Sequence, residues 1–454
     1  MMTLRLRRTA TLLACLALLS CSKITGRQSH TDDPAAACKR CNVVLVSMDT
    51  VRADHLGVYG YGKDTSPNID RLARNSVIFE DAISQAAWTL PAHASMFTGL
   101  QPAELGLTAY PSLHSPRIIP ATVPTLASAF QAAGYATAGF TGGGFVAAHF
   151  GFGRGFDVYT SSGRRFEHNI GQALAWIGQQ GSRPFFLFLH GYDAHRPYYS
   201  EAQDKRAVGL EGTLEVERRE FCRGDNPSRP RDLDTVISYY DAAIHHADRS
   251  LGLLFDALGK SGLSEKTIVL LTSDHGEEFF EHGNCDHALS LYRETLHVPY
   301  LVQVPGLPSR RVGGPVPASR SIAPTLLALT GVESPIAGPS LLAAVERGQR
   351  YAQPVYSHAI SKSGHRGSRG EAIAITTTDS KIVIYTEEGS QEAFDRVRDP
   401  AESSPLPQGH PTYRLAAKLP SWAEEHRATD ADSRQSAPLP RQLREELRSL
   451  GYLD

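Results

Sequence analysis

The sequence lacks the features that would place the chain among nucleic-acid-binding or membrane-spanning proteins. Over 454 residues the formal net charge is only −2, so no broad basic excess exists to neutralise nucleic-acid phosphates. After the N-terminal segment, no apolar run approaches the roughly 20 residues of a membrane-spanning helix. The apolar share of 41% is enough for a sizeable core, and the length favours one large domain with a smaller partner.

Cysteine is also scarce, with six residues in the chain, two of them in the N-terminal segment. The others are Cys38, Cys41, Cys222 and Cys285. In an oxidising compartment the first two and the last two are each expected to form a disulfide bond, although the sequence does not fix the connectivity. A redox CxxC motif fits less well, because this pair precedes the first strand, and a two-cysteine zinc clip has no evident partner ligands.

The N-terminus has the organisation of a targeting segment. Arginines within the first eight residues precede an apolar stretch, 9–20, that is too short to span a bilayer comfortably. The run Leu18-Leu19-Ser20-Cys21 matches a lipobox, so we expect residues 1–20 to be a lipoprotein signal peptide and Cys21 to carry the lipid. An ordinary signal peptide containing a chance cysteine is the alternative.

Acylation of Cys21 would hold the mature protein at a membrane that it does not cross. Residues 21–41 are rich in small and polar side chains, as expected of a flexible tether. Serine, not aspartate, follows the cysteine, and this pattern resembles outer-membrane sorting in Gram-negative lipoproteins. We therefore expect an exported protein, lipid-anchored to a bacterial envelope membrane, the outer one favoured, and facing the periplasm or the cell surface.

From residue 42 onward, predicted strands and helices alternate. The strands are expected at 42–48, 77–79, 135–140, 185–189, 267–271 and 299–304, and the helices at 67–73, with Ser66 as its N-cap, 123–133, 167–180, 233–258 and 322–329. This alternation predicts an α/β domain over 42–345, with a mostly parallel sheet sandwiched by helices. The polar stretch 200–233 is expected to be an insertion at the rim of that domain.

A second, smaller unit is expected over 346–454. Its segment 371–395 is typical of an antiparallel hairpin or meander, which predicts a small antiparallel sheet. The last helix carries Leu443, Leu447 and Leu450 on one face, so we expect it to dock on the rest of the protein.

Candidate catalytic residues stand where predicted strands end and where one helix begins. Asp49 ends the first strand, and Asp274 with His275 ends the strand at 267–271. Since ligands bind at the carboxyl edge of such sheets, these side chains are expected to meet there. Thr89 lies at a helix start, where backbone N–H groups favour an anion. Asp49, Thr89, Asp274 and His275 thus form a plausible ligand set for one divalent cation, which would favour the Thr89 alkoxide as nucleophile.

Three further histidines are candidates for the chemistry. His195 follows a strand and is the candidate acid for the leaving oxygen, with a structural histidine as the alternative. His287 follows a loop whose path the sequence does not indicate, so a catalytic and a structural role are both open. His93 comes one turn after Thr89, so it would orient Thr89, bind the anion or simply face a neighbouring element. Arg52 is expected to form a scaffold ion pair, with contact to the oxyanion as the alternative. Asp241 and Asp248 are expected to face solvent or cap a loop, and His245 and His246 are expected at the surface.

Separated stretches of the chain match the motifs of one family in that family's order. They are NVVLVSMDTVRADHLGVYGY from Asn42, TSPNIDRLA from Thr65, WTLPAHASMFTGL from Trp88, PFFLFLHGYDAHRPY from Pro184, TSDHGEEFFEHG from Thr272, HALSLYRE from His287 and DPAE from Asp399. On these residues the chain resembles the sulfatase family of the alkaline phosphatase superfamily. The resemblance implies that family's two-part fold and a metal-bound nucleophile that attacks a sulfuric or phosphoric ester. It also implies that Asp49, Asp274 and His275 are ligands, Thr89 the nucleophile, and that His195 and His287 lie near the substrate.

The chain also departs from the family pattern. Sulfatases carry a cysteine or serine that is oxidised to formylglycine, and an arginine four residues later, where this chain has Thr89 and His93. Threonine cannot yield the aldehyde. Thr50 stands in place of a second acidic ligand, and His275 in place of asparagine. An imidazole ligand favours zinc or manganese over calcium, although calcium stays open.

Three functions are compatible with these residues. The first is hydrolysis of sulfuric or phosphoric esters, with phosphodiesters or phosphonates favoured over sulfates because no aldehyde forms. The second is transfer of a phospho-headgroup to envelope glycans or lipids, and the third is binding of glycans by a catalytically inactive lipoprotein. The expected partners are a sulfated or phosphorylated small molecule, glycan or lipid headgroup and a membrane, but no nucleic acid.

Overall fold

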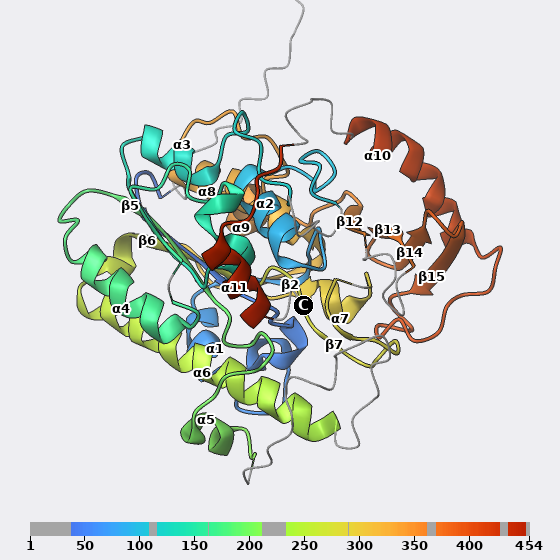
Figure 1. Ribbon diagram of the computed structural model, residues 1–454, viewed down its shortest axis with the longest axis horizontal. Coiled ribbons are helices and arrows are strands. Elements are labelled where there is room, and N and C mark those ends of the chain that lie inside the picture. The colour runs from blue at the N-terminus through green and yellow to red at the C-terminus, as the bar shows by residue number, and fades with distance from the viewer. Residues whose placement is uncertain are drawn as a thin grey trace, which may run out of the picture. The chain divides into compact units, whose positions relative to one another are not determined.

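The computed structural model describes residues 38–108, 116–161, 163–210, 233–288, 290–360, 369–426 and 435–450 (Figure 1). The chain separates into residues 1–35 and residues 36–454, and all described residues belong to the second unit. The predicted signal peptide, Cys21 and most of the predicted tether lie outside the described residues. Among the described residues, no helix is both long enough and apolar enough to cross a membrane.

A large, mostly parallel sheet forms the centre of this unit. Its strands stand in the order β11 (Arg310–Pro317), β2 (Val77–Ile83), β10 (Tyr300–Gln303), β6 (Thr267–Thr272), β1 (Asn42–Met48), β5 (Phe185–Gly191), β3 (Ala136–Phe140) and β4 (Val158–Thr160), and β9 (His297–Val298) pairs with β2. The strand β1 is parallel to both β5 and β6, and every one of its residues is buried. Its β-branched, apolar sequence is what a strand covered on both faces requires. The strand β10 runs antiparallel to both of its neighbours.

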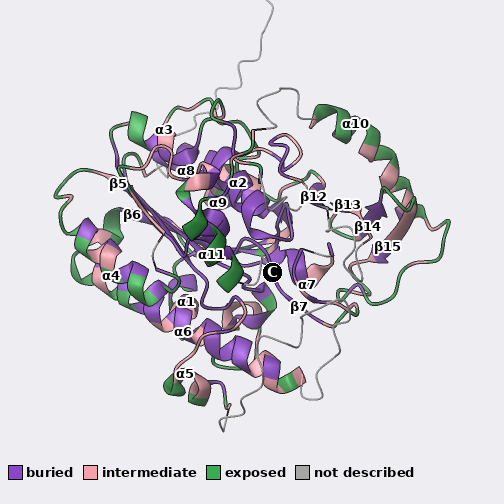
Figure 2. Ribbon diagram, in the orientation of Figure 1, coloured by how far each residue is buried: buried purple, intermediate pink, exposed green. Residues whose placement is uncertain are grey.

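Helices cover both faces of the sheet (Figure 1). Alternate residues of β1 point into two separate apolar cores, one on each face of the sheet. Val43 and Leu45 belong to the first core, and Val44 and Val46 belong to the second. The first core lies under α2 (Thr89–Thr98), α3 (Leu126–Ala132), α8 (Ala318–Thr330), α9 (Leu342–Arg347) and α11 (Arg441–Ser449). The second lies under α1 (Pro67–Ala73), α4 (Phe166–Ile177) and α6 (Leu233–Lys260), and α5 (Ala202–Ala207) packs on α6. The helix sides that face the sheet are buried (Figure 2).

A second, antiparallel sheet follows in the C-terminal part of the chain. It consists of β12 (Val355–Ile360), β13 (Glu371–Thr376), β14 (Ser380–Tyr385) and β15 (Ser390–Asp395). One face joins a core with Ile83, Leu291 and Leu296 of the larger part. The other face packs against the segment that precedes α10 (Leu419–Glu425). Between the two sheets lie the short elements β7 (Glu278–Phe279), β8 (Cys285–Asp286) and α7 (Arg293–Leu296).

The predicted fold class is confirmed, with differences in detail. Strand β12 and helix α9 were not predicted, and β10 and β9 make the main sheet mixed. The last helix docks as expected, because Leu443, Leu447 and Leu450 are buried in the first core. The domain boundary after residue 345 stays a prediction.

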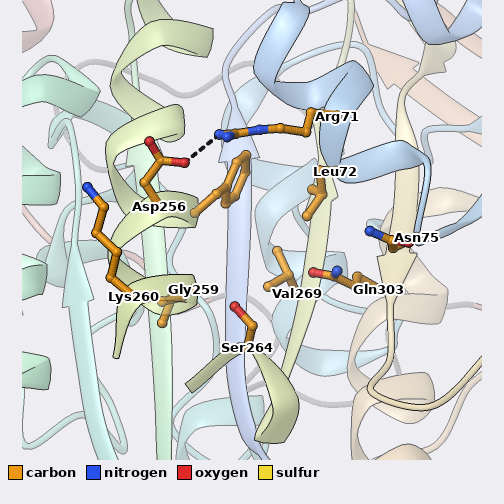
Figure 3. Close-up of a pocket in the computed structure, with 11 residues that line it drawn as sticks. Arg71, Leu72, Asn75, Asp256, Gly259, Lys260, Ser264, Val269 and Gln303 are labelled. Carbon is orange, nitrogen blue, oxygen red and sulfur yellow. Dashed lines mark ion pairs between the residues drawn. The ribbon is translucent and has the colours of Figure 1, made fainter. Parts of the chain in front are cut away.

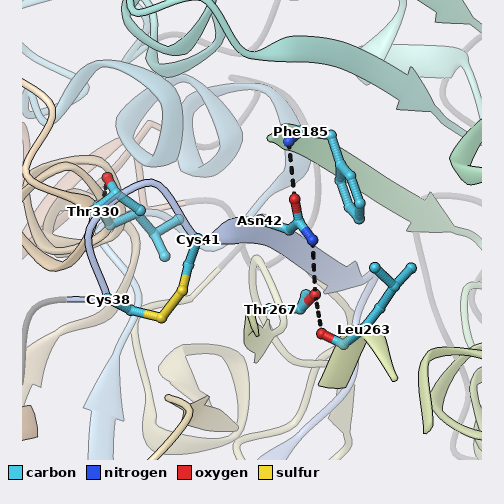
Figure 4. Close-up of a disulfide and its surroundings, with 8 residues drawn as sticks. Cys38, Cys41, Asn42, Phe185, Leu263, Thr267 and Thr330 are labelled. Carbon is cyan, nitrogen blue, oxygen red and sulfur yellow. Dashed lines mark hydrogen bonds between the residues drawn. A yellow bond between two sulfur atoms is a disulfide. The ribbon is translucent and has the colours of Figure 1, made fainter. Parts of the chain in front are cut away.

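The start of β1 is fixed by a disulfide bond and by one buried amide. Cys38 and Cys41 form a disulfide bond, with their Cα atoms 5.3 Å apart, as the sequence predicted (Figure 4). Next to it, Asn42 accepts a hydrogen bond from the Phe185 N–H and donates one to Thr267 Oγ1. These bonds join the first residues of β1, β5 and β6, so the three strands reach their carboxyl ends in a defined register. Cys285 is also disulfide-bonded, whereas Cys222 lies outside the described residues.

The DPAE motif joins the second sheet to α7 through a buried ion pair. Lys381 Nζ in β14 lies 2.5 Å from the Glu402 carboxylate, with both side chains at most 3% exposed. Glu402 also accepts the Arg293 N–H of α7, and its carbonyl accepts a hydrogen bond from the His282 imidazole. The motif is therefore structural and lies between the second sheet and the main domain.

We expect Glu402→Gln to lower the free energy of unfolding by about 3–5 kcal/mol, because it leaves the Lys381 ammonium buried without its counter-charge. The amide still accepts the Arg293 N–H. The double variant Lys381→Met/Glu402→Gln should recover much of the loss, since it removes the orphaned charge. Urea unfolding of the three proteins measures both effects, and a loss below about 1 kcal/mol in the single variant would contradict the assignment.

Candidate active site

The sheet places two aspartates, Asp49 and Asp274, at the same edge. Strands β1 and β6 are parallel, with Ser47 opposite Thr272, so Asp49 and Asp274 follow their strands at one carboxyl edge. Both side chains are fully buried. Helix α2 begins at Thr89, which is also fully buried. Asp49, Thr89, Asp274 and His275, the residues that the sequence predicted as ligands, therefore lie together, and their roles stay a prediction.

The Thr89 hydroxyl lies between groups that can deprotonate or hold it. Its Oγ1 is 3.5 Å from Asp49 Oδ2 and 3.4 Å from His275 Nε2. As the first residue of α2, Thr89 also stands at the N-terminus of that helix, where the helix dipole favours an anion. A tetrahedral oxyanion ester placed there would have its central atom next to this oxygen.

The carboxylates fit a divalent cation. One ligand atom each from Asp49, Asp274 and His275 lies within 4.8 Å of the others. Asp49 Oδ1 and Asp274 Oδ2 are buried and accept no hydrogen bond from the described residues. Burial and the adjacent Asp274 raise the pKa of Asp49 well above its usual value. A cation between the two carboxylates would satisfy both orphaned oxygens and remove this repulsion.

His275 is held in the form that a metal ligand needs. Its Nδ1–H donates to the Gly276 carbonyl at 2.9 Å, so Nε2 presents its lone pair toward Thr89 and Asp274. Burial lowers the pKa of His275 to about 4, and the ring is neutral at pH 7. Burial favours a higher pKa for Asp274, but His275, His93 and His190 outweigh it and lower the pKa to about 2.

His93 supports the turn that carries the hydroxyl. Its Nδ1–H donates to the Thr89 carbonyl at 2.9 Å, and its Nε2 accepts a hydrogen bond from Ser47 Oγ at 3.0 Å. Nδ1 also lies 3.4 Å from Asp274 Oδ2. Since both ring nitrogens have partners inside the protein, the geometry favours an orienting role over anion binding. Ser47, one strand residue before Met48, was not identified from the sequence.

His190 is a site residue that sequence reasoning missed. It belongs to the carboxyl end of β5, and its Nδ1 accepts a hydrogen bond from the Gly142 N–H. Its Nε2–H therefore donates to Asp49 Oδ2 at 3.2 Å. Burial lowers its pKa well below the usual value, so the ring is neutral. The rule that selected Asp49 and Asp274, a polar residue at the end of a buried parallel strand, would also have selected His190.

His195 and His287 lie side by side next to the cluster. Their ring centroids are 5.2 Å apart, and the His287 ring is 4.5 Å from that of His275. The pKa of His195 falls to about 3 through burial and the adjacent His287. Burial also opposes protonation of His287, but Asp286 at 2.7 Å and Glu277 at 3.3 Å raise its pKa well above the usual value.

Three residues that were expected to face solvent, Asp241, Asp248 and His246, are buried instead. Asp241 and Asp248 are fully buried on α6: Asp241 accepts hydrogen bonds from His55, Tyr61 and Lys63, and Asp248 accepts the Asn68 and Ile69 N–H groups of α1. His246 is fully buried as well. Arg52 is a scaffold residue, as expected, paired with Asp54 and Glu281.

A cavity elsewhere in the protein has no part in this cluster. It lies between α1 and α6, and is lined by residues that include the Arg71–Asp256 ion pair, Lys260, Val269 and Gln303 (Figure 3). Val269 pairs with Gln303 in the first half of β6, away from the end that leads to Asp274.

Comparisons with known proteins agree with this architecture. A family model described as Sulfatase matches residues 41–332. The chain is 24% identical to an ulvan-active sulfatase of Formosa agariphila over 93% of its own length and 89% of the relative's. It is 27% identical to arylsulfatase A of Bos taurus over 66% of each chain. The crystal structure of phosphonate monoester hydrolase of Agrobacterium radiobacter has a TM-score of 0.69 at 18% identity, covering 85% of this chain and 96% of that one.

Proposed function

Because the chain belongs to the sulfatase family, whose members are hydrolases of sulfuric or phosphoric esters, we propose that it cleaves phosphodiesters or phosphonates in preference to sulfates through a covalent Thr89 ester. One observation carries the proposal: an unmodified hydroxyl, that of Thr89, stands at a helix start within 3.5 Å of Asp49 Oδ2 and His275 Nε2. A hydroxyl held in this way is a nucleophile that needs only a charge-withdrawing partner.

Asp49, Thr89, Asp274 and His275 would hold one divalent cation. When bound, the metal would lower the pKa of the Thr89 hydroxyl and offset the charge on the ester oxygens. The set of two carboxylates, a hydroxyl and an imidazole favours zinc or manganese, with calcium as the less favoured choice.

The chain's own residues then supply the steps. Thr89 Oγ1 gives its proton to Asp49 Oδ2 and attacks phosphorus in line, so that the new Thr89 O–P bond forms as the bond to the leaving oxygen breaks. The proton returns to Thr89 Oγ1 when water releases the ester. His287, beside His275 and held by Asp286 and Glu277, gives its proton to the leaving oxygen and later takes one from the water that hydrolyses the Thr89 ester. The positive end of the α2 dipole stabilises the charge on the nonbridging oxygens. We assign the acid to His287 and not to His195, the residue expected from the sequence, because burial keeps the His195 ring neutral.

The preference against sulfate follows from the residue at position 89. Threonine has one hydroxyl on Cβ, so its ester can be released only by attack at sulfur or phosphorus. A hydrated aldehyde could instead expel sulfate with its second hydroxyl, and that route is absent here. The proposed substrates are phosphorylated small molecules, glycans or lipid headgroups, with sulfated ones less favoured, reached from a lipid-anchored position in the bacterial envelope.

A substrate panel with metal analysis tests this function. Aryl sulfate, phosphate monoester, phosphodiester and phosphonate substrates that share one leaving group would be compared by kcat/KM after metal loading. We expect the phosphodiester or phosphonate to exceed the sulfate by at least about tenfold, and acid quenching to trap a phosphoryl group on Thr89. A clear preference for the sulfate would contradict the proposed chemistry.

A further inference from the structure

A second set of metal-ligating side chains lies among the helices on one side of the main sheet. It consists of Glu167 in the first turn of α4, Glu201 just before α5 and His246 in α6. One nitrogen or oxygen atom of each lies within 4.8 Å of the others. The set shares no residue with the active-site cluster. We propose that Glu167, Glu201 and His246 form a zinc site that stabilises the fold beside the active site.

The strongest evidence is the environment of His246. The residue is fully buried, and its Nδ1 lies 2.8 Å from Asp193 Oδ1, to which it donates a hydrogen bond. The other nitrogen, Nε2, is buried and has no hydrogen-bond partner among the described residues. Its nearest charged neighbour is Glu167 Oε2 at 3.9 Å, too far for a hydrogen bond. A buried ring nitrogen without a partner is costly, and a cation between it and the two glutamates would satisfy it.

The orientation of the imidazole is fixed in the way that histidine ligands of zinc usually are. Asp193 accepts the Nδ1–H through Oδ1, while its Oδ2 accepts the backbone N–H of Phe166, the first residue of α4, at 3.0 Å. The carboxylate therefore cannot turn away without losing the second bond. A carboxylate behind the ring sets the tautomer with the Nε2 lone pair free and raises its basicity.

The two glutamates can complete the site with small movements. Ligand atoms at 2.0–2.1 Å in a tetrahedral zinc site lie about 3.4 Å apart, close to the 3.9 Å between His246 Nε2 and Glu167 Oε2. The Glu167 side chain is 57% exposed and can turn toward a cation. Glu201 is 39% exposed, and to turn it must exchange the hydrogen bonds that its Oε2 accepts from Gln203 and Arg249 for the metal; water can take the fourth position. One nitrogen and two carboxylate oxygens suit zinc.

The guanidinium of Arg249 would compete with a metal ion for Glu201. Arg249 Nη2 lies 2.8 Å from Glu201, and its Nε lies 3.2 Å from Asp204. Arg249 can keep the bond to Asp204 when Glu201 turns to the metal. Arg165, the residue before α4, lies with its guanidinium over the Tyr199 ring at 3.3 Å and is engaged there.

The position of the site explains what the zinc would do. It would join α4, α6 and the segment before α5 around Asp193, which lies in the loop that carries His195. Zinc would therefore stabilise this loop without taking part in the reaction.

The test uses full-length protein carrying Asp274→Ala, so that zinc in the active-site cluster does not obscure the measurement. Zinc is titrated in competition with a chromogenic chelator, and the melting temperature is followed with and without zinc. We expect one zinc per chain to remain bound and to raise the melting temperature. Adding Glu167→Ala or His246→Gln should weaken zinc binding at least tenfold and abolish the rise.

The exposed position of Glu167 keeps this test independent of folding, since Glu167→Ala removes a surface side chain. Glu265→Ala, at another exposed glutamate, is the matched control and should leave zinc binding unchanged. Zinc binding that is absent from the Asp274→Ala protein, or that is unaffected by both ligand variants, would overturn the proposal. Neither readout depends on turnover, so this result is separate from any failure of the proposed hydrolysis.

Discussion

Replacing Thr89 with alanine is expected to lower kcat/KM for the best phosphoester substrate by about ten-thousand-fold or more. The change removes the oxygen that would form the covalent ester, and removal of the nucleophile of a serine protease costs roughly 10⁶-fold in kcat. It also removes one of the four expected metal ligands. Steady-state kinetics on the metal-loaded protein measure the loss.

Serine at the same position is the matched control. Thr89→Ser keeps the hydroxyl at the start of α2 and loses only a methyl group, so kcat/KM should stay within about tenfold of the original value. Acid quenching should trap a phosphoryl group on position 89 in the threonine and serine proteins but not in the alanine protein. An alanine variant with undiminished kcat/KM, or an adduct on another residue, would refute the assigned nucleophile.

The parts of this site that the sequence could predict are those governed by local patterns. The apolar runs at 42–48 and 267–271 predict buried parallel strands, and such strands deliver Asp49 and Asp274 to one edge of the sheet. Thr89 precedes a proline at a helix start, which local sequence also indicates. The fold class followed from the same alternation of strands and helices, and it is confirmed.

Burial of charged residues on α6 could not be predicted in this way. The helix is amphipathic, but Asp241 and Asp248 lie on its inner side because distant groups satisfy them. Asp248 accepts N–H groups at the start of α1, 179 and 180 residues earlier in the chain. Ser66 was expected to cap this helix, but its side chain makes no capping bond, because Asp248 takes that place. Partners so far apart in sequence leave no local signal.

The assignment of the acid depended on electrostatics that only the fold reveals. The sequence favours His195 as the acid, because it follows a predicted strand, and indicates no such position for His287. In the structure the adjacent carboxylates of Asp286 and Glu277 hold a proton on His287, while burial removes one from His195. Both carboxylates precede His287 closely in sequence, but only the pairing of β7 with β8 places Glu277 against it.

Asp274→Asn should remove one equivalent of bound metal and lower kcat/KM by about a thousandfold or more. In asparagine an NH2 group takes the place of Oδ2, the oxygen that has no hydrogen-bond partner in the described part of the chain, and an NH2 group does not bind a metal ion. The change also removes one negative charge from the cation site. The retained oxygen can still accept the Thr50 and His275 N–H groups that now bind Oδ1, so the loop after β6 should keep its shape.

Metal analysis by mass spectrometry and kinetics on the same samples separate this effect from misfolding. Asn284→Asp, which adds a carboxylate on a partly exposed loop, is the control for a change of one charge near the site and should leave the metal content unchanged. If the Asp274→Asn protein kept its full metal content and its kcat/KM, the cation would have to be held elsewhere. The Asp49–Asp274 pair would then have no chemical reason to be buried with two unsatisfied oxygens, because burying two adjacent carboxylates without a cation is unfavourable.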